Sequence, residues 1–323
     1  MISIDDGLSR FLGKELEKVG NIFESQLEGE HEIINQICQH IESYRGKMLR
    51  PSLVLLSALA SGAKDVGESH RVIAAVVEMI HMATLVHDDV LDEADTRRGG
   101  RTVNDLHGNE MAVMLGDYLI SNAFHLCSSI NLPWVNLLLG STTNTLCEGE
   151  LIQLGNRQNL DIGEDTYFTI VEKKTASLIG ASCRLGASLV GENENIASRL
   201  ERFGIASGTA FQITDDLLDL VGEEEVVGKS VGRDLEKGKL TLPIIYALGE
   251  ADAGSREKLV EIIHSRDLVG LRDMVNGCGS IDRALKKAAS LVDTAKSELC
   301  GLPDTPARDL LATLADGILE RRY

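Results

Sequence analysis

Hydrophobic residues recur at three- and four-residue spacing along most of the 323-residue chain. This spacing gathers apolar side chains on one face of an α-helix, and the two-residue alternation typical of β-strands is nearly absent. The pattern therefore predicts an all-α protein, with helices over residues 4–26, 30–44, 50–62, 67–93, 109–130, 133–157, 164–188, 195–221, 241–249, 254–264, 280–299 and 305–321.

Short polar segments separate these helices. The residues Arg98-Gly99-Gly100 are expected to end the helix that begins near residue 67, and Pro133 is expected to open another. No stretch rich in proline and serine resembles a linker, and the apolar helices continue without a compositional shift. We therefore expect a single domain over residues 1–323.

The net charge of the chain and the spacing of its cysteines argue against several classes of function. The chain has 32 Lys and Arg residues against 50 Asp and Glu residues, and its formal net charge of -18 would repel nucleic acid. Its six cysteines show no Cys-x-x-Cys spacing, so we expect no zinc or redox motif and a reduced, cytoplasmic setting. No apolar stretch reaches the ~20 residues that span a bilayer, so we expect no transmembrane segment, although the protein could touch a membrane surface.

Two acidic clusters of the same spacing each close an apolar helix. They are Asp88, Asp89 and Asp92 in the first cluster, and Asp215, Asp216 and Asp219 in the second. In each cluster the first and last carboxylates are four residues apart, so they lie on one helix face about one turn from each other. Such charges need a cation, and Mg²⁺ takes carboxylate oxygens while sharing its other ligand positions with substrate phosphates.

One such cluster alone would be weak evidence, because Asp-Asp-x-x-Asp is common on solvated helix ends. A pair is stronger evidence. Both clusters follow helices that look buried, and both are followed by basic residues and glycines, which a solvated helix end does not predict. Two such faces looking across a cavity would hold a diphosphate between them through bridging metal ions.

Basic residues supply candidate phosphate ligands. Lys47 and Arg50 precede Pro51 at a junction of loop and helix, where backbone N–H groups also favour an anion. Arg97 and Arg98 follow the first acidic cluster, either to neutralise neighbouring acids or to clamp a phosphate. Each motif by itself would more often be surface charge than a site.

Further basic residues lie in the second half of the chain. Lys174 and Thr175 lie on a helix rich in small residues, and the second acidic cluster is followed by a Gly/Lys-rich segment that contains Lys229 and Lys239. The segment is not a Walker A loop, because Glu223 stands where the first glycine of that motif belongs. A positively charged lid over phosphates remains consistent with it.

These motifs together are similar to those of one enzyme family, from about Gly46 to the end of the chain. The sequence resembles the trans-isoprenyl diphosphate synthases, specifically their long-chain, octaprenyl-like branch. The matching motifs, in the order of the family, are Gly-Lys-x-x-Arg-Pro, His-Asp-Asp-x-x-Asp-x-x-x-x-Arg-Arg-Gly, Gly-Asp-Tyr-Leu, Glu-Gly-Glu-Leu-x-Gln, Lys-Thr, Phe-Gln-x-x-Asp-Asp-x-x-Asp and Gly-Lys-x-x-x-x-Asp-Leu-x-x-Gly-Lys-x-Thr-Leu-Pro.

Some positions depart from the family pattern. The chain has Arg45 and Met48 where the family often has glycine and arginine, but it keeps the two basic residues between and after them. Some members also use a basic group at the C-terminus, and either Arg321 or Arg322 could supply it here.

The resemblance implies an antiparallel helical bundle around a central cavity, the isoprenoid synthase fold, in a homodimer. It implies about three Mg²⁺ ions in each active site. The direct ligands would be Asp88, Asp92 and Asp215, while Asp89, Asp216 and Asp219 would act directly or through water. The ligands of the allylic diphosphate would be Arg97, Lys174, Lys229 and Lys239, and those of isopentenyl diphosphate would be Lys47, Arg50, His81 and Arg98.

The implied reaction joins isopentenyl diphosphate head-to-tail to an allylic diphosphate such as farnesyl or geranylgeranyl diphosphate. Divalent ions and cationic side chains would stabilise the departing diphosphate, so that the allylic C–O bond ionises in a water-poor cavity. Oxygens of Thr175 and Gln212 would stabilise the carbocation. Attack by the isopentenyl double bond and loss of a proton would then lengthen the chain by one unit.

Product length is expected to depend on residues one or more turns before Asp88. Short-chain relatives tend to place aromatic residues four and five positions upstream, where this chain has Thr84 and Ala83. One helical turn of ~5.4 Å is close to the length of one isoprene unit, so a deeper floor allows a longer product. We expect a long product with Phe124 as part of the floor, although ordinary core packing would also explain Phe124.

Alternative functions make different demands on the sequence. A shorter-chain synthase, for geranylgeranyl or farnesyl diphosphate, would use the same chemistry. A class I terpene cyclase normally has a different second metal motif and needs no ligands for a second diphosphate. A non-catalytic subunit of a synthase typically loses one or both acidic clusters, and this chain keeps both.

Overall fold

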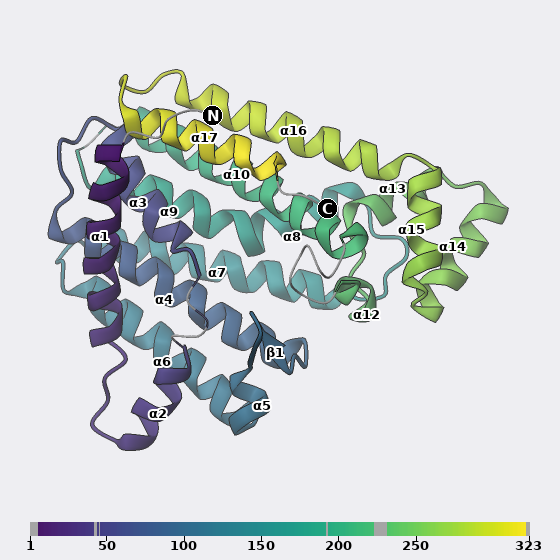
Figure 1. Ribbon diagram of the computed structural model, residues 1–323, viewed down its shortest axis with the longest axis horizontal. Coiled ribbons are helices and arrows are strands. Elements are labelled where there is room, and N and C mark those ends of the chain that lie inside the picture. Colours follow the sequence, from purple (N-terminus) through teal and green to yellow (C-terminus); the bar gives the residue numbers. More distant parts are fainter. Residues whose placement is uncertain (1–5, 42–43, 45, 192, 223–230, 321–323) are drawn as a thin grey trace. The chain divides into compact units, whose positions relative to one another are not determined.

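The structure, a computed structural model, describes residues 6–41, 44, 46–191, 193–222 and 231–320 (Figure 1). In these ranges the chain is helical apart from one antiparallel hairpin, formed by β1 (Thr96–Arg97) and β2 (Gly100–Arg101). The prediction of an all-α protein is therefore confirmed. Five residues named in the sequence analysis lie outside the described ranges, namely Arg45, Glu223, Lys229, Arg321 and Arg322.

Contacts within the chain divide it into two compact units. Unit 1 comprises Met1–Thr143, Leu178–Arg202 and Glu298–Ala312, and unit 2 comprises Asn144–Ser177, Phe203–Ser297 and Thr313–Tyr323. The two units are described separately below, and the expectation of a single domain stays a prediction.

Unit 1 is built around the apolar helix α4 (Glu68–Leu91), which is buried along most of its length. An apolar helix without a polar face is stable only where neighbours cover it on several sides. α4 packs against α6 (Asn109–Ser128), where a Cβ on Gly116 would come within 2.1 Å of the His87 ring. The other elements wholly or mainly in unit 1 are α1 (Asp6–Ser25), α2 (Glu32–Ile41), α3 (Leu49–Ala60), α5 (Val103–His107) and α9 (Ser177–Ser188).

Unit 2 has its own core, made by apolar side chains such as Ile213, Leu217, Leu271 and Ala288. Its elements are α8 (Glu164–Val171), the π-helical turn η2 (Glu172–Ala176), α12 (Arg233–Glu236), α13 (Leu242–Glu250), α14 (Ala253–Ser265), α15 (Leu268–Gly277) and most of α16 (Ser280–Leu299). The units divide helices α7 (Pro133–Gly155), α10 (Glu194–Val221) and α17 (Pro306–Leu319), and one or two terminal residues of α9 and α16 also fall in the other unit.

The predicted helices agree with the structure except near the first acidic cluster and in three short elements. Helix α4 ends at Leu91, two residues before the predicted end at position 93, because the chain turns back there into the hairpin. The sequence analysis did not predict α5, α12 or α15. Two of these helices begin at a single capping side chain: Thr102 accepts from the N–H of Asp105 in α5, and Asp267 accepts from the N–H of Gly270 in α15.

Helix α4 is also long and apolar enough to pass a test for membrane-spanning segments. However, 72% of its most apolar window is buried inside the protein. The buried core helix of a protein that never enters a membrane passes the same test, so this result is weak evidence for a span.

The approach of α3 and α9 leads to a stability prediction. A Cβ on Gly186 would come within 2.1 Å of the carbonyl oxygen of Val54, and backbone atoms cannot move aside as a flexible side chain can. Gly186→Ala should therefore destabilise the protein by about 1–3 kcal/mol in denaturant unfolding. Gly140→Ala is the matched control, because nothing lies within 4 Å of a Cβ there. It should stabilise by about 0.5–1 kcal/mol, since alanine is the better helix former, and equal effects of both changes would contradict the packing argument.

Candidate functional site

The first acidic cluster lies at the C-terminal end of α4. The N–H of Asp92 donates to the carbonyl of Asp88 at 2.8 Å, so the helical turn continues through both residues. Asp88 and Asp92 are half-buried, whereas Asp89 is 1% exposed and lies in the interior. The predicted spacing of the two outer carboxylates by one helical turn is therefore present in unit 1.

Asp89 has a cationic partner in Arg97. The Nε of Arg97 donates to both carboxylate oxygens at 2.9 and 3.0 Å, and its Nη2 lies 2.8 Å from Oδ1. The hairpin brings Arg97 back to α4 through a turn in which Arg98 and Gly99 have φ angles of 50° and 79°. Positive φ at both central residues is the requirement of a tight type I′ turn. Because Arg97 neutralises Asp89, this carboxylate is the least suited of the cluster to direct metal binding.

Three predicted ligands of the second diphosphate come together near this hairpin. Burial, together with the charges of Arg50, Arg98 and Arg97, lowers the pKa of His81 well below its ordinary value. Burial also lowers the pKa of Arg50 to about 10, although the nearby charge of Glu78 opposes this shift. Burial is the main cause of both shifts, and the two guanidinium groups near His81 favour an anion at this position.

The loop before α3 adds to this cationic group. The guanidinium of Arg98 donates to the backbone carbonyl of Tyr44. It also covers Gly46, where a Cβ would come within 2.6 Å of it. Lys47 follows directly and is exposed. Lys47 is therefore next in sequence to the glycine that the Arg98 guanidinium covers.

Sequence reasoning missed two residues of unit 1 that support these side chains. Tyr44 is buried, and its hydroxyl accepts from the N–H of Val103 at 3.0 Å. Burial, together with the charge and hydrogen bond of Asp89, raises the pKa of Tyr44 above its ordinary value. Glu78 is 3% exposed, and its negative charge acts on both Arg50 and Arg98. Its position as the one acid within an apolar stretch of α4 was a usable signal.

In unit 2, Lys174 is held by the Glu-Gly-Glu-Leu-x-Gln motif of α7. Its Nζ donates to Oε1 of Gln153 at 2.8 Å and forms an ion pair with Glu150. Gly149 allows this approach, since a Cβ there would come within 2.6 Å of the backbone nitrogen of Lys174. The sequence analysis quoted this motif but assigned Glu150 no role.

Lys174 and Thr175 lie in the π-helical turn η2, where a single continuous α-helix was expected. A π-turn inserts one extra residue into a helix and often occurs at functional sites, because it changes the direction of the side chains that follow. Here it separates α8 from α9 without interrupting the helix.

A chain of hydrogen bonds connects Thr175 to the second acidic cluster. The hydroxyl of Thr175 donates to Oε1 of Gln212 at 3.0 Å, and Nε2 of Gln212 donates to Oδ1 of Asp216 at 2.8 Å. Oδ2 of Asp216 accepts from the hydroxyl of Tyr167 at 2.6 Å. Tyr167 was not predicted. Burial, followed by the negative charge of Asp234, raises the pKa of Asp216 well above its ordinary value.

Asp219 holds the segment that follows the second cluster. Its carboxylate accepts from the backbone N–H of Arg233 at 3.3 Å and from that of Asp234 at 3.0 Å, at the start of α12. Its carbonyl accepts from the N–H of Gly232 at 2.8 Å. The half-buried Lys239 follows α12, and its N–H donates to the carbonyl of Asp234 at 2.8 Å. Asp219 therefore orders the chain toward Lys239.

These positions can be tested against the expected metal. In the part of the chain that the structure describes, no group of three or more His, Cys, Asp or Glu side chains is arranged to hold an ion alone. Mg²⁺ does not require one, because it keeps several waters and binds through one or two carboxylates together with substrate phosphates. The half-buried Asp88, Asp92 and Asp215 fit that mode. Pairing of the two clusters across a cavity stays a prediction.

The residues predicted to control product length lie on α4 and α6 of unit 1. Ala83 is completely buried, and Thr84 is half-buried with its hydroxyl donating to the carbonyl of His81 at 2.8 Å. Phe124 is half-buried on α6. Their proposed effect on length stays a prediction.

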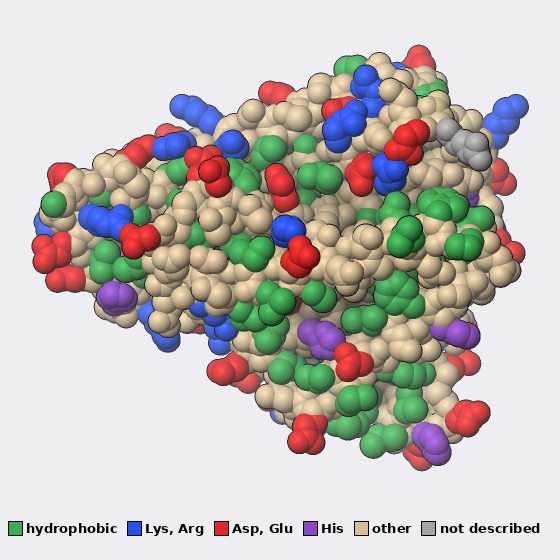
Figure 2. Space-filling view, turned by 180° about the vertical axis from the view of Figure 1, so that it is seen from behind, with side chains coloured by type: hydrophobic (Ala, Val, Ile, Leu, Met, Phe, Trp, Pro, Cys, Tyr) green, Lys and Arg blue, Asp and Glu red, His purple; other side chains and the backbone are tan. Residues whose placement is uncertain are grey.

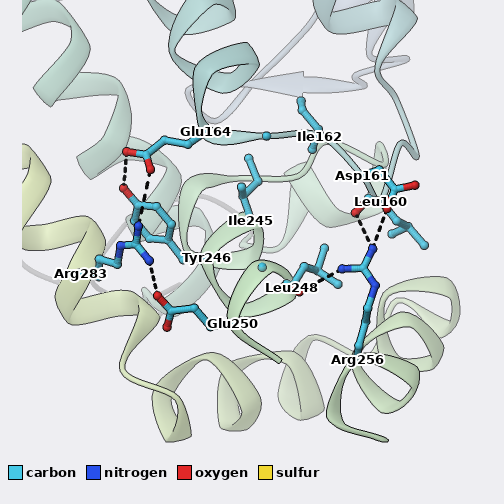
Figure 3. A pocket seen from close by; sticks show the side chains of 12 residues that line it. Leu160, Asp161, Ile162, Glu164, Ile245, Tyr246, Leu248, Glu250, Arg256 and Arg283 are labelled. Atoms are coloured by element: carbon cyan, nitrogen blue, oxygen red, sulfur yellow. Dashed lines mark hydrogen bonds and ion pairs between the residues drawn. The ribbon is translucent and has the colours of Figure 1, made fainter. Parts of the chain in front are cut away.

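A separate pocket of about 430 Å³ lies within unit 2 and contains none of the predicted residues (Figure 3). Its charged groups are paired with one another. Arg283 forms ion pairs with Glu164 and Glu250 and stacks 3.7 Å above the ring of Tyr246, and Arg256 lies 2.7 Å from Asp161. These pairs connect α8, α13, α14 and α16, so the pocket has a structural explanation.

Comparison with known proteins agrees with this arrangement. The family model described as polyprenyl synthetase matches residues 31–272. The chain is 35% identical to octaprenyl diphosphate synthase of Escherichia coli over 97% of this chain and 98% of that protein. It is 37% identical to heptaprenyl diphosphate synthase component 2 of Geobacillus stearothermophilus, over 97% and 98% respectively.

Solved structures show the same similarity. A decaprenyl diphosphate synthase from Rhodobacter capsulatus matches with a TM-score of 0.92 and 36% identity, covering 98% of this chain and 99% of that one. A polyprenyl synthase from Caulobacter crescentus, complexed with calcium and isoprenyl diphosphate, matches with a TM-score of 0.91 and 32% identity, covering 98% of each chain. With these matches and the motifs in place, the chain belongs to the polyprenyl synthetase family.

Proposed function

We propose that this protein is a long-chain trans-polyprenyl diphosphate synthase. It condenses isopentenyl diphosphate head-to-tail onto an allylic diphosphate, either farnesyl or geranylgeranyl diphosphate. The observation that carries the proposal is the pair of guanidinium groups, Arg50 and Arg98, that lie near His81 beside the first acidic cluster. It supplies ligands for a second diphosphate, which a condensation needs and a cyclisation does not. The names of the similar long-chain synthases support the same class.

The residues of the chain have separate tasks in this reaction. Lys174, Lys239 and Lys229, with Arg97, bind the allylic diphosphate, and the cationic group in unit 1, with Lys47, binds isopentenyl diphosphate. Bound Mg²⁺ supplies positive charge that stabilises the departing diphosphate. Lys174 exchanges its contact with Glu150 for a phosphate oxygen, because a doubly charged diphosphate attracts the ammonium more strongly.

Carbon–carbon bond formation then depends on the oxygens near the reacting carbon. Thr175 and Gln212 present partial negative charge to the allylic cation, which lowers its energy without any rearrangement during the reaction. The isopentenyl double bond attacks this cation. The new cation loses a proton to the departed diphosphate, and the product carries one more unit with its own diphosphate intact.

We propose that the reaction requires Mg²⁺, with about three ions bound in each active site. The calcium in the similar Caulobacter structure supports use of a divalent cation. Asp88, Asp92 and Asp215 are the proposed direct ligands, because they are the half-buried carboxylates of the two clusters.

We further propose that the protein acts as a homodimer in the cytoplasm, with peripheral contact to a membrane during product release. Hydrophobic side chains reach the surface in several groups on the face seen in Figure 2. In unit 1, Leu137 on α7 is 73% exposed and Met114 on α6 is 62% exposed. Exposed apolar side chains on neighbouring helices are typical of surfaces that a partner covers. The name "component 2" of one relative makes a different protein the alternative partner.

Two other functions remain distinguishable by experiment. A class I terpene cyclase would consume an allylic diphosphate without consuming isopentenyl diphosphate. A non-catalytic subunit would fail to elongate any primer by itself. Consumption of isopentenyl diphosphate by the purified chain excludes both.

The first prediction concerns the acidic clusters. The purified protein with Mg²⁺, isopentenyl diphosphate and farnesyl diphosphate should form elongated products, separated by length after dephosphorylation. Asp88→Ala and Asp215→Ala should each lower kcat by about 10²- to 10³-fold or more, because charge stabilisation of the departing diphosphate is lost. The exposed Glu257→Ala serves as the control and should retain full activity. Full activity in both cluster variants would contradict the assignment.

The second prediction concerns the metal. Removal of divalent ions with a chelator should abolish elongation, and added Mg²⁺ should restore it, because the carboxylates bind diphosphate only through a cation. Isothermal titration with inorganic diphosphate should show binding with Mg²⁺ and much weaker binding without it. Elongation that persists in chelator would show that the cationic side chains suffice.

The third prediction concerns product length. Thr84→Phe should shorten the main product by several isoprene units, and Phe124→Ala should lengthen it, because each unit occupies about one helical turn. Phe11→Ala, which removes a half-buried ring from α1, is the control and should leave the length distribution unchanged. An unchanged distribution in Phe124→Ala would remove that residue from the floor.

A further inference from the structure

Tyr167 has no role in the reaction as described above, although it ends a buried hydrogen-bond chain that begins at Thr175. We propose that Tyr167 is a positioning residue, which acts through Asp216 and Gln212 to direct the oxygen lone pairs of Thr175 toward the reacting carbon. The inference rests on the proposed function. It concerns which group orients the hydroxyl, a question that the family assignment leaves open.

The π-turn places Tyr167 and Thr175 on the same side of their helix. In a regular α-helix, residues eight positions apart are rotated by about 80° from each other. The π-turn η2 widens one turn by about one residue, which brings position 175 back into line with position 167. Asp216 and Gln212 are four residues apart on α10, so they form the matching pair on the facing helix. Two hydrogen bonds therefore connect the helices, one from Tyr167 to Asp216 and one from Thr175 to Gln212.

The amide of Gln212 sets the direction of this chain. Its Nε2 can only donate and faces Oδ1 of Asp216, while the Tyr167 hydroxyl donates to Oδ2. The amide oxygen of Gln212 then points at Thr175, whose hydroxyl must donate its proton. A hydroxyl that donates in this direction keeps both lone pairs for another partner. The half-buried Thr175 therefore directs the lone pairs of its oxygen, and not its O–H proton, away from Gln212.

Burial makes the terminal donor necessary. Tyr167 is 5% exposed and Asp216 is 6% exposed, so water cannot readily replace the phenol. The ring of Tyr167 is held in the core with Ile213 and Leu217, and it meets Phe168 edge-on at 5.5 Å. Without the phenol, the second oxygen of Asp216 lacks its donor. The Gln212 amide can then shift toward that oxygen and release Thr175.

The test compares Tyr167→Phe with Tyr246→Phe. Tyr246 lies in the same unit, is 4% exposed, and donates its hydroxyl to Glu164 at 2.8 Å in the pocket of Figure 3. Tyr167→Phe should lower kcat for the first condensation by about 10- to 100-fold, with KM for both substrates changed less than about threefold. Tyr246→Phe should leave both constants near those of the unchanged protein. Equal rates for the two variants would overturn the proposal.

A double-mutant cycle with Thr175→Val separates positioning from general damage. If Tyr167 acts through Thr175, the double variant should be no slower than Thr175→Val alone. Rate losses that multiply would overturn the proposal, because they would show that the two residues act independently.

The same cycle in denaturant unfolding gives a readout that needs no catalysis. The unfolding equilibrium constant of the double variant should depart by at least about twofold from the value expected for independent changes. Independent effects on stability would show that the hydrogen-bond chain is not formed, and would also overturn the proposal. Failure of the unchanged protein to elongate would instead refute the proposed function, while the stability cycle would still decide whether Tyr167 is coupled to Thr175.

Discussion

The burial of negative charge at the ends of apolar helices is the constraint on which the candidate site depends. An ionised carboxylate away from water needs compensation, and removing one partner of a buried pair typically costs about 3–5 kcal/mol. The structure compensates each inner carboxylate differently. Asp89 is paired with a guanidinium, Asp216 accepts from a phenol and an amide, and Asp219 accepts from backbone N–H groups. The half-buried first residue of each cluster, Asp88 and Asp215, is therefore proposed as a metal ligand.

Unusual backbone conformations also place cationic side chains next to these acids. A turn with two positive φ angles returns Arg97 to α4, where it neutralises Asp89. A π-turn sets the direction of Lys174. Gly149 permits α7 to approach the backbone at Lys174, so that carboxylate and amide groups can hold its ammonium. In each case an unusual local conformation positions a cation against an acid. Conformations of this kind are retained where the surrounding structure determines them.

The cationic group in unit 1 has an excess of positive charge instead. The guanidinium charges of Arg50 and Arg98 both act on His81, and the charge of Glu78 acts on both guanidinium groups. An anionic ligand would neutralise these guanidinium groups, which agrees with the proposed second diphosphate. Each unit thus contains both acidic and basic side chains, organised by contacts within that unit.

The sequence by itself determined the helical class, the spacing of both acidic clusters and most helix boundaries, because these features depend on residues close together in the chain. It also led to a prediction of which side chains bind phosphate. Only the tertiary structure decided the partners of the charged groups. Tyr167 is 49 residues from Asp216, and Lys174 is 21 residues from Gln153. Helix packing alone brings such residues together, and no local pattern encodes which distant donor will face a given carboxylate.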